Sequence, residues 1–162
     1  MLRSGWGLAA GLIAAASYVA VTLLFYYLFR PVNRGLSLLA ALISLIGCSL
    51  GPLGMLLKFP APANVSLVFF GGYCLLIGYL ILRSTFLPRF VGALMMFAGL
   101  GWLTFASPPL VNSLYPYVLL PGLLGEGCLT AWLLLMGVDA QKWTEQARAP
   151  VIQGRVAAPP PR

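Results

Sequence analysis

Glu126 is the side chain in this sequence best suited to chemistry inside an apolar layer. It lies near the middle of the apolar run from Val118 to Val138, and no other acidic residue occurs before Asp139. A carboxyl group is costly to bury in hydrocarbon, so it usually faces protein or water and can bind a ligand or relay a proton. Alternatively, a neutral carboxyl group can hydrogen-bond a neighbouring helix and only stabilise the packing. The sequence leaves both interpretations open.

Three other polar side chains can share the depth of Glu126. At a rise of about 1.5 Å per residue, Glu126 and Tyr73 each lie roughly 12 Å from the outer end of their apolar run. Ser49 falls within about one turn of that depth, and Thr130 follows Glu126 by four residues and so shares its helix face. We predict that these four residues form one buried polar layer or ligand site, in which Tyr73 or Thr130 hydrogen-bonds the carboxyl group. The alternative is a chance alignment of residues that are common in membrane helices.

The usual catalytic and metal-binding patterns are missing from the sequence. The chain has no histidine, and its three cysteines form no CxxC pair. A Ser-His pair, a His-based metal site and a zinc site with Cys ligands are therefore excluded. The apolar runs contain no Asp, which excludes a site with paired carboxylates there. We predict that the protein is not an enzyme and has no catalytic residue, metal site or cofactor.

The composition places the chain among membrane proteins. Hydrophobic residues make up 60% of it and charged residues only 8%, whereas a soluble domain carries about 25% charged residues. The formal net charge is +7, but the basic residues lie in short segments between apolar runs. That distribution favours contact with anionic lipid headgroups over nucleic acid. We expect membrane lipids as partners, and no nucleic acid.

Five apolar runs are each close to the length that crosses a bilayer as a helix. Because a helix satisfies every backbone group within one segment, we predict an all-α, polytopic membrane bundle over residues 1–138. Its five transmembrane helices are expected at 7–29, 36–57, 65–82, 90–106 and 118–138. Residues 139–162 lack apolar periodicity, and we predict a cytoplasmic tail that is mostly disordered beyond Ala147.

The distribution of Lys and Arg predicts the orientation of the bundle. Eight basic residues follow the first, third and fifth runs, whereas only Arg3 and Lys58 lie on the other side. Because cytoplasmic segments carry the Lys/Arg excess, the N-terminus is expected outside and the C-terminus inside.

Several ordered pieces of the sequence resemble a known family. They are LFRPVNR at 28–34, LLAAL at 38–42, FFGGYCLLIGYLI at 69–81, FLPR at 86–89 with Gly92 and AGLGWL at 98–103, and LPG at 120–122 with Gly125, Glu126 and AWLLLMGV at 131–138. Together they are similar to a bacterial family of multi-pass membrane proteins, domain of unknown function number 4386. The resemblance covers about residues 20–138. It implies a six-helix fold in the family and no known reaction.

The chain departs from that family pattern in two respects. Family members usually have a further leading helix, so we interpret this chain as shortened at its N-terminus. The resemblance also implies ionisable residues within the membrane: Arg, Asp and His are usual where this chain has Ser44, Asn64 and Tyr73. Glu126 alone matches the pattern. If these groups form a relay or a ligand site in the family, this chain has lost most of it.

The leading functional prediction is a structural or accessory protein of a bacterial cytoplasmic membrane that packs against itself or another membrane protein. The GxxxG motifs at Gly7–Gly11 and Gly47–Gly51 predict close helix contacts and suit that role. The alternative is a carrier or binder of a small or lipidic ligand that uses a cavity at Glu126. A cavity that reaches Glu126 would favour the binder, and a filled polar layer would favour the structural role.

Overall fold

The computed structural model describes residues 2–56 and 63–156 of the chain, with side chains described over 13–50 and 64–149. Within these ranges the chain is helical almost throughout and contains no strand, which confirms the all-α prediction. The helices are α1 (Leu2–Phe29), α2 (Arg34–Leu56), α3 (Ala63–Arg83), α4 (Arg89–Leu103), α5 (Pro108–Leu114), α6 (Leu120–Leu135) and α7 (Ala140–Val156), and 3-10 turns cover Thr104–Ala106 and Tyr117–Leu119.

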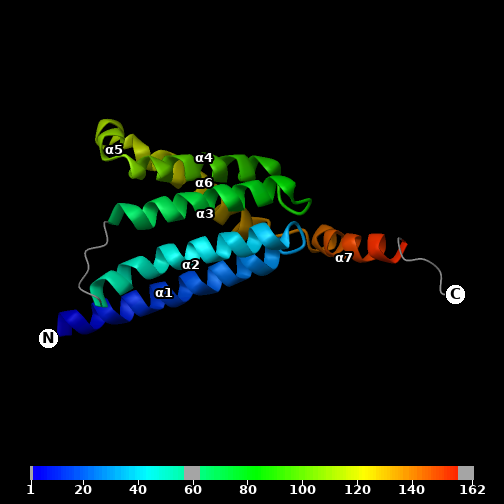
Figure 1. The fold of residues 1–162 in the computed structure, drawn as a ribbon, viewed down its shortest axis with the longest axis horizontal. Helices are drawn as coiled ribbons and strands as arrows, with labels where there is room; N and C mark the ends of the chain where they lie inside the picture. The colour runs from blue at the N-terminus through cyan, green and yellow to red at the C-terminus, as the bar shows by residue number, and fades with distance from the viewer. Residues whose placement is uncertain (1, 57–62, 157–162) are drawn as a thin grey trace.

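The long helices pack side by side in a bundle. Each is in contact with the next in the order α1, α2, α3, α4 and α6 (Figure 1). The short helix α5 and the helix α7 lie at opposite ends of this bundle (Figure 1). The buried core is centred on α3 and α4, with Ile77, Leu80, Val91 and Met95 among its members.

Glycines allow α3 and α4 to approach almost to backbone contact. Gly71 on α3 faces Gly99 on α4, and Gly78 faces Gly92. The two glycines of each helix are seven residues, or about two turns, apart. A Cβ atom added to Gly78 would lie 2.7 Å from the backbone nitrogen of Met96 and 2.8 Å from the backbone oxygen of Gly92. The spacing therefore fixes how α3 and α4 are rotated against each other.

The GxxxG prediction is confirmed at the one glycine whose surroundings are described. A Cβ atom on Gly47 would lie 2.9 Å from the Cβ atom of Phe69, so α2 and α3 also pack closely there. Gly7, Gly11 and Gly51 lie outside the residues whose side chains are described.

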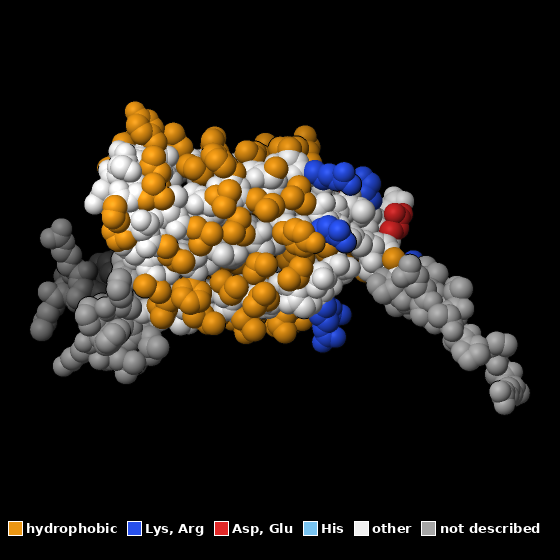
Figure 2. All heavy atoms as spheres, turned by 45° about the horizontal axis from the view of Figure 1, so that its top comes forward, with side chains coloured by type: hydrophobic (Ala, Val, Ile, Leu, Met, Phe, Trp, Pro, Cys, Tyr) orange, Lys and Arg blue, Asp and Glu red, His pale blue; other side chains and the backbone are white. Residues whose placement is uncertain are grey.

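The surface of the bundle is that of a membrane protein. Three helical stretches are long and apolar enough to cross a membrane, at Asn64–Arg83, Arg89–Ala106 and Tyr117–Leu135. Two shorter apolar helices, Ile13–Phe29 and Arg34–Leu50, accompany them within the described ranges. Large hydrophobic side chains are exposed along the sides, and exposed Lys and Arg side chains gather at one end (Figure 2). We call this the basic end; it carries Arg30, Arg34, Arg83 and Arg89.

The prediction of disorder beyond Ala147 is wrong as far as residue 156, because α7 continues to Val156. Residues 157–162 lie outside the described residues. A local signal starts this helix: Asp139 Oδ1 accepts a hydrogen bond of 3.1 Å from the backbone N–H of Lys142, as an N-cap residue does. The hydrogen bond from that N–H, with the Lys142 ammonium 3.0 Å away, holds the pKa of Asp139 below its ordinary value. The sequence prediction overlooked this cap.

Side chains of α7 attach the helix to the basic end of the bundle. Trp143 Nε1 donates a 2.9 Å hydrogen bond to the backbone oxygen of Leu28, at the end of α1. Gln146 Oε1 accepts hydrogen bonds of 3.1 Å from both the backbone N–H and the hydroxyl of Thr85, in the turn between α3 and α4. The connection from α6 turns at Gly137, whose φ of +69° is the left-handed conformation that glycine adopts after a helix end.

Candidate ligand-binding groove at Glu126

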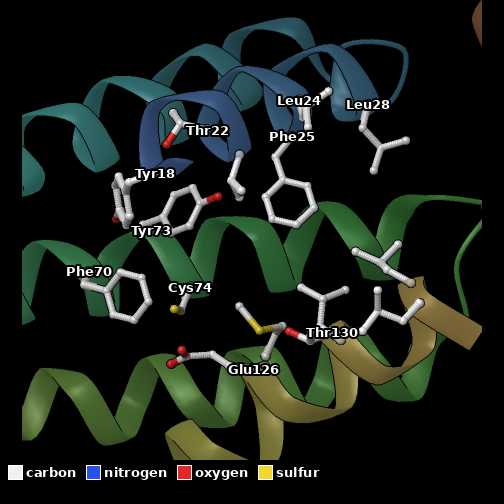
Figure 3. Close-up of a pocket in the computed structure, with 15 residues that line it drawn as sticks. Tyr18, Thr22, Leu24, Phe25, Leu28, Phe70, Tyr73, Cys74, Glu126 and Thr130 are labelled. Carbon is white, nitrogen blue, oxygen red and sulfur yellow. The ribbon is translucent and has the colours of Figure 1, made fainter. Parts of the chain in front are cut away.

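A cavity of about 560 Å³ lies where α1, α3 and α6 converge. We call it the groove (Figure 3). Residues of four helices line the groove. They are Tyr18, Val21, Thr22, Leu24, Phe25 and Leu28 of α1, Phe70, Tyr73 and Cys74 of α3, Met95 of α4, and Glu126, Leu129, Thr130, Leu133 and Leu134 of α6.

The groove opens on the side of the bundle rather than at its end. Cys74 lies at its base and is fully buried, whereas Leu24 on α1 and Leu134 on α6 are 67% and 79% exposed. On α1 the lining residues extend from the middle of the helix to Leu28, next to Arg30 at the basic end. The groove therefore runs from mid-bundle towards the basic end. Its rim lies on the exposed apolar side of the bundle.

Glu126 is half-buried and is held by a tryptophan on the neighbouring helix. Trp102 Nε1, on α4, donates a hydrogen bond of 2.6 Å to Glu126 Oε1. Gly122, one turn before Glu126, makes room for the indole, because a Cβ atom there would lie 2.8 Å from Trp102 Cζ2. The indole also packs edge-on against Phe70, with ring centroids 5.6 Å apart. Glu126 thus faces other helices, but the expected partner was wrong: it is Trp102, not Tyr73 or Thr130.

Tyr73 brings a buried hydroxyl group to the groove. Its side chain is 6% exposed, and its ring packs against Phe70 at a centroid distance of 6.1 Å. Among the described residues the Tyr73 hydroxyl has no hydrogen-bond partner. Buried hydroxyl groups nearly always have one. An unpaired donor beside a cavity is therefore a place where a ligand can bind, and Figure 3 shows the ring in the space between α1 and α3.

Thr130 and Ser49, the other residues of the predicted polar layer, lie in different surroundings. Thr130 is exposed and lines the groove one turn after Glu126. Ser49 is exposed and is not part of the groove; its hydroxyl donates a 2.6 Å hydrogen bond to the backbone oxygen of Leu45, in its own helix. Such a bond satisfies a serine locally and frees it from any partner on another helix. The prediction of a single layer that includes Ser49 is therefore wrong, because depth along a helix does not specify the face.

A polar pair that the sequence analysis did not propose joins α1 to α2. The hydroxyl oxygens of Thr22 and Ser44 are 2.8 Å apart, and both side chains are almost completely buried. Hydroxyl groups commonly bond across helices in this way within membranes. Thr22 also lines the groove, so this bond fixes part of its α1 wall. Ser44 occupies one of the positions where the resemblance implies an ionisable residue.

The groove offers few ligands for a metal ion. In the described ranges, no three His, Cys, Asp or Glu side chains gather closely enough to hold one. Of the side chains that line the groove, Glu126 and Cys74 are the ones of these four types. The arrangement is therefore that of an apolar cavity with a carboxyl group and a buried phenol, which can orient a molecule by one or two hydrogen bonds.

A family model described as Domain of unknown function (DUF4386) matches residues 55–137, just over half of the chain. The chain belongs to this family. The matched residues include Tyr73, Trp102 and Glu126, so the acidic side of the groove lies within the DUF4386 domain, whereas α1 precedes it. The family that the sequence predicted is thus confirmed, and the pieces at 28–34 and 38–42 lie before the matched residues.

One relative of this DUF4386 protein comes from an archaeon. An uncharacterized protein of Archaeoglobus fulgidus is 26% identical over 129 residues, which cover 74% of this chain and 76% of that protein. No solved structure matches the chain.

Proposed function

We propose that this DUF4386 protein binds a small or lipidic, largely apolar molecule in the groove. The observation that carries the proposal is the cavity itself, which reaches Glu126. A purely structural role predicted that packed side chains would fill the space around this residue. Its volume of about 560 Å³ falls within the range of roughly 300–1,000 Å³ that is usual for small-molecule sites. The lateral opening suits a ligand that arrives from the lipid, and the unpaired Tyr73 hydroxyl provides a polar contact. The proposal is binding, not catalysis; a structural or accessory role stays a prediction.

The proposal includes five transmembrane helices in a bacterial cytoplasmic membrane, with the N-terminus outside. It is supported by the exposed apolar sides of the bundle and by the basic end, because cytoplasmic segments of membrane proteins carry an excess of Lys and Arg. The groove then extends from mid-membrane towards the cytoplasmic leaflet.

The orientation can be tested by cysteine labelling in intact cells. In a variant without native cysteines, single cysteines at Asn112 and Thr85 are expected to differ in their reaction with a membrane-impermeant thiol reagent. Asn112 lies on α5, at the end opposite the basic end, and should be labelled from outside; Thr85 lies in the basic-end turn and should react only after lysis. Both positions are exposed, so access is comparable. The reverse pattern would contradict the orientation.

Ligand binding can be tested by filling the groove from its rim. Thr130 is exposed and lines the groove, so Thr130→Phe places a ring in the cavity without displacing buried side chains. We expect native mass spectrometry in mild detergent to detect a co-purifying lipid or other apolar compound with the wild-type protein, reduced about tenfold or more in Thr130→Phe. Ala131→Phe is the matched control, because Ala131 is exposed on the same helix and does not line the groove. Equal amounts of bound compounds in all three proteins would contradict the proposal.

A further inference from the structure

The charges in the groove restrict what it can bind. Glu126 is the one Asp or Glu among the described side chains that line it, and no Lys or Arg accompanies it. The exposed arginines of the basic end lie beyond the groove. An anionic headgroup placed beside Glu126 would lose its hydration without gaining a counterion, which is strongly unfavourable. A positively charged group would instead find a carboxylate as its counterion.

The walls of the groove also favour a cation. Tyr18 and Phe25 of α1 and Phe70 and Tyr73 of α3 place four aromatic rings around the cavity. The faces of aromatic rings attract cations, and the attraction increases where water is excluded. Glu126 Oε1 is occupied by the Trp102 N–H. In the part of the chain that the structure describes, Oε2 makes no side-chain hydrogen bond, so it is free to meet a ligand.

We propose that the groove binds a lipophilic organic cation, with the Glu126 carboxylate as its counterion. This inference rests on the proposed function and names the class of ligand. The aromatic walls surround the cation, and the apolar side chains towards Leu133 and Leu134 contact its hydrophobic part. If Glu126 carries a proton before the ligand arrives, one proton leaves for each cation bound and the charge of the site stays balanced.

The affinity for the cation then depends on pH through Glu126. The other titratable groups that line the groove are Tyr18 from α1 and Tyr73 and Cys74 from α3, and each of them is uncharged when protonated. The nearby α4 side chains, Met95 and Trp102, do not titrate. At low pH protons compete with the cation for Glu126, so affinity should fall as pH is lowered.

The test uses three probes of similar shape and different charge on the full chain in detergent. Tetraphenylphosphonium is a cation, triphenylphosphine oxide is a neutral hydrogen-bond acceptor, and tetraphenylborate is an anion. By isothermal titration calorimetry we expect the cation to bind, and to bind at least tenfold more weakly to Glu126→Gln. The neutral oxide should show no dependence on this substitution, and the borate should not bind. Glu145→Gln is the control, because Glu145 is an exposed acid on α7, outside the groove.

The outcomes separate this inference from the proposed function. If the oxide binds as well as the cation, or if Glu126→Gln leaves the cation affinity unchanged, Glu126 is not the counterion of the ligand. The inference is then overturned while binding in the groove stands. If no probe binds and Thr130→Phe leaves the co-purifying compounds unchanged, both fail. The pH dependence can be measured on the wild-type protein alone. In the range where Glu126 is mainly protonated, the affinity for the cation should drop about tenfold for each unit by which the pH is lowered. An affinity independent of pH would overturn the inference even if Glu126→Gln failed to fold.

Discussion

Gly78→Ala is expected to lower the free energy of unfolding by about 1–3 kcal/mol, the cost of overpacking a well-filled interface. The new methyl group would lie within 2.8 Å of backbone atoms of α4 on two sides, at Met96 and Gly92. Backbone atoms cannot turn aside as a flexible side chain can, so α3 and α4 must move apart. Because their close packing supports much of the buried core, the loss should appear as a lower melting temperature and a lower midpoint in denaturant titrations followed by circular dichroism.

Gly127→Ala provides the matched control for this experiment. Gly127 lies within α6, and a Cβ atom there would meet nothing within 4 Å. Because alanine forms helix better than glycine, this variant should be unchanged or up to about 1 kcal/mol more stable. Equal effects of the two substitutions would show that α3 and α4 do not approach as closely as described.

The second large effect is expected at the Glu126–Trp102 hydrogen bond. Glu126→Ala removes the acceptor and leaves a half-buried indole N–H unpaired, which should cost about 1–2 kcal/mol. Glu126→Gln retains an oxygen that can accept the 2.6 Å bond and should be nearly neutral. The same denaturant titrations measure both values.

A double-mutant cycle tests whether that hydrogen bond accounts for the loss. Trp102→Phe removes the donor, so adding Glu126→Ala to it should cost clearly less than Glu126→Ala alone. Strictly additive effects would mean that Glu126 contributes through another contact. A loss with Glu126→Gln as large as with Glu126→Ala would indicate that the negative charge, rather than the hydrogen bond, stabilises the fold.

The helices could be predicted from the sequence because long apolar runs leave the backbone no other way to satisfy its polar groups. The predicted runs at 65–82 and 90–106 agree closely with apolar helices of the structure. Depth could also be estimated, since rise per residue is constant. The direction in which a side chain points could not, because it depends on how neighbouring helices are rotated. Ser49 and Tyr73 illustrate this: both were predicted at the depth of Glu126, and only Tyr73 reaches the groove.

The position of Trp102 did have a signal in the sequence. Gly71 and Gly78 are seven residues apart, and so are Gly92 and Gly99, which indicates one glycine face on each of two successive helices. Trp102 follows Gly99 by three residues and therefore lies near the same side of α4. The GxxxG motifs rest on glycines four residues apart and do not include this longer repeat. The indole was consequently not proposed as the partner of Glu126.

The attachment of α7 has a mechanical consequence for access to the groove. The Trp143–Leu28 hydrogen bond ties α7 to the basic end of α1, and the Thr22–Ser44 pair ties α1 to α2. An outward movement of the α1 wall must therefore carry α2 with it and turn about the basic end. Tyr18 lies ten residues from Leu28, at the end of a lever about 15 Å long. A small rotation therefore displaces the α1 wall little at Leu28 and much more beside Tyr18. The ligand that we propose would pass most readily beside Tyr18, close to the carboxyl group that we propose holds it.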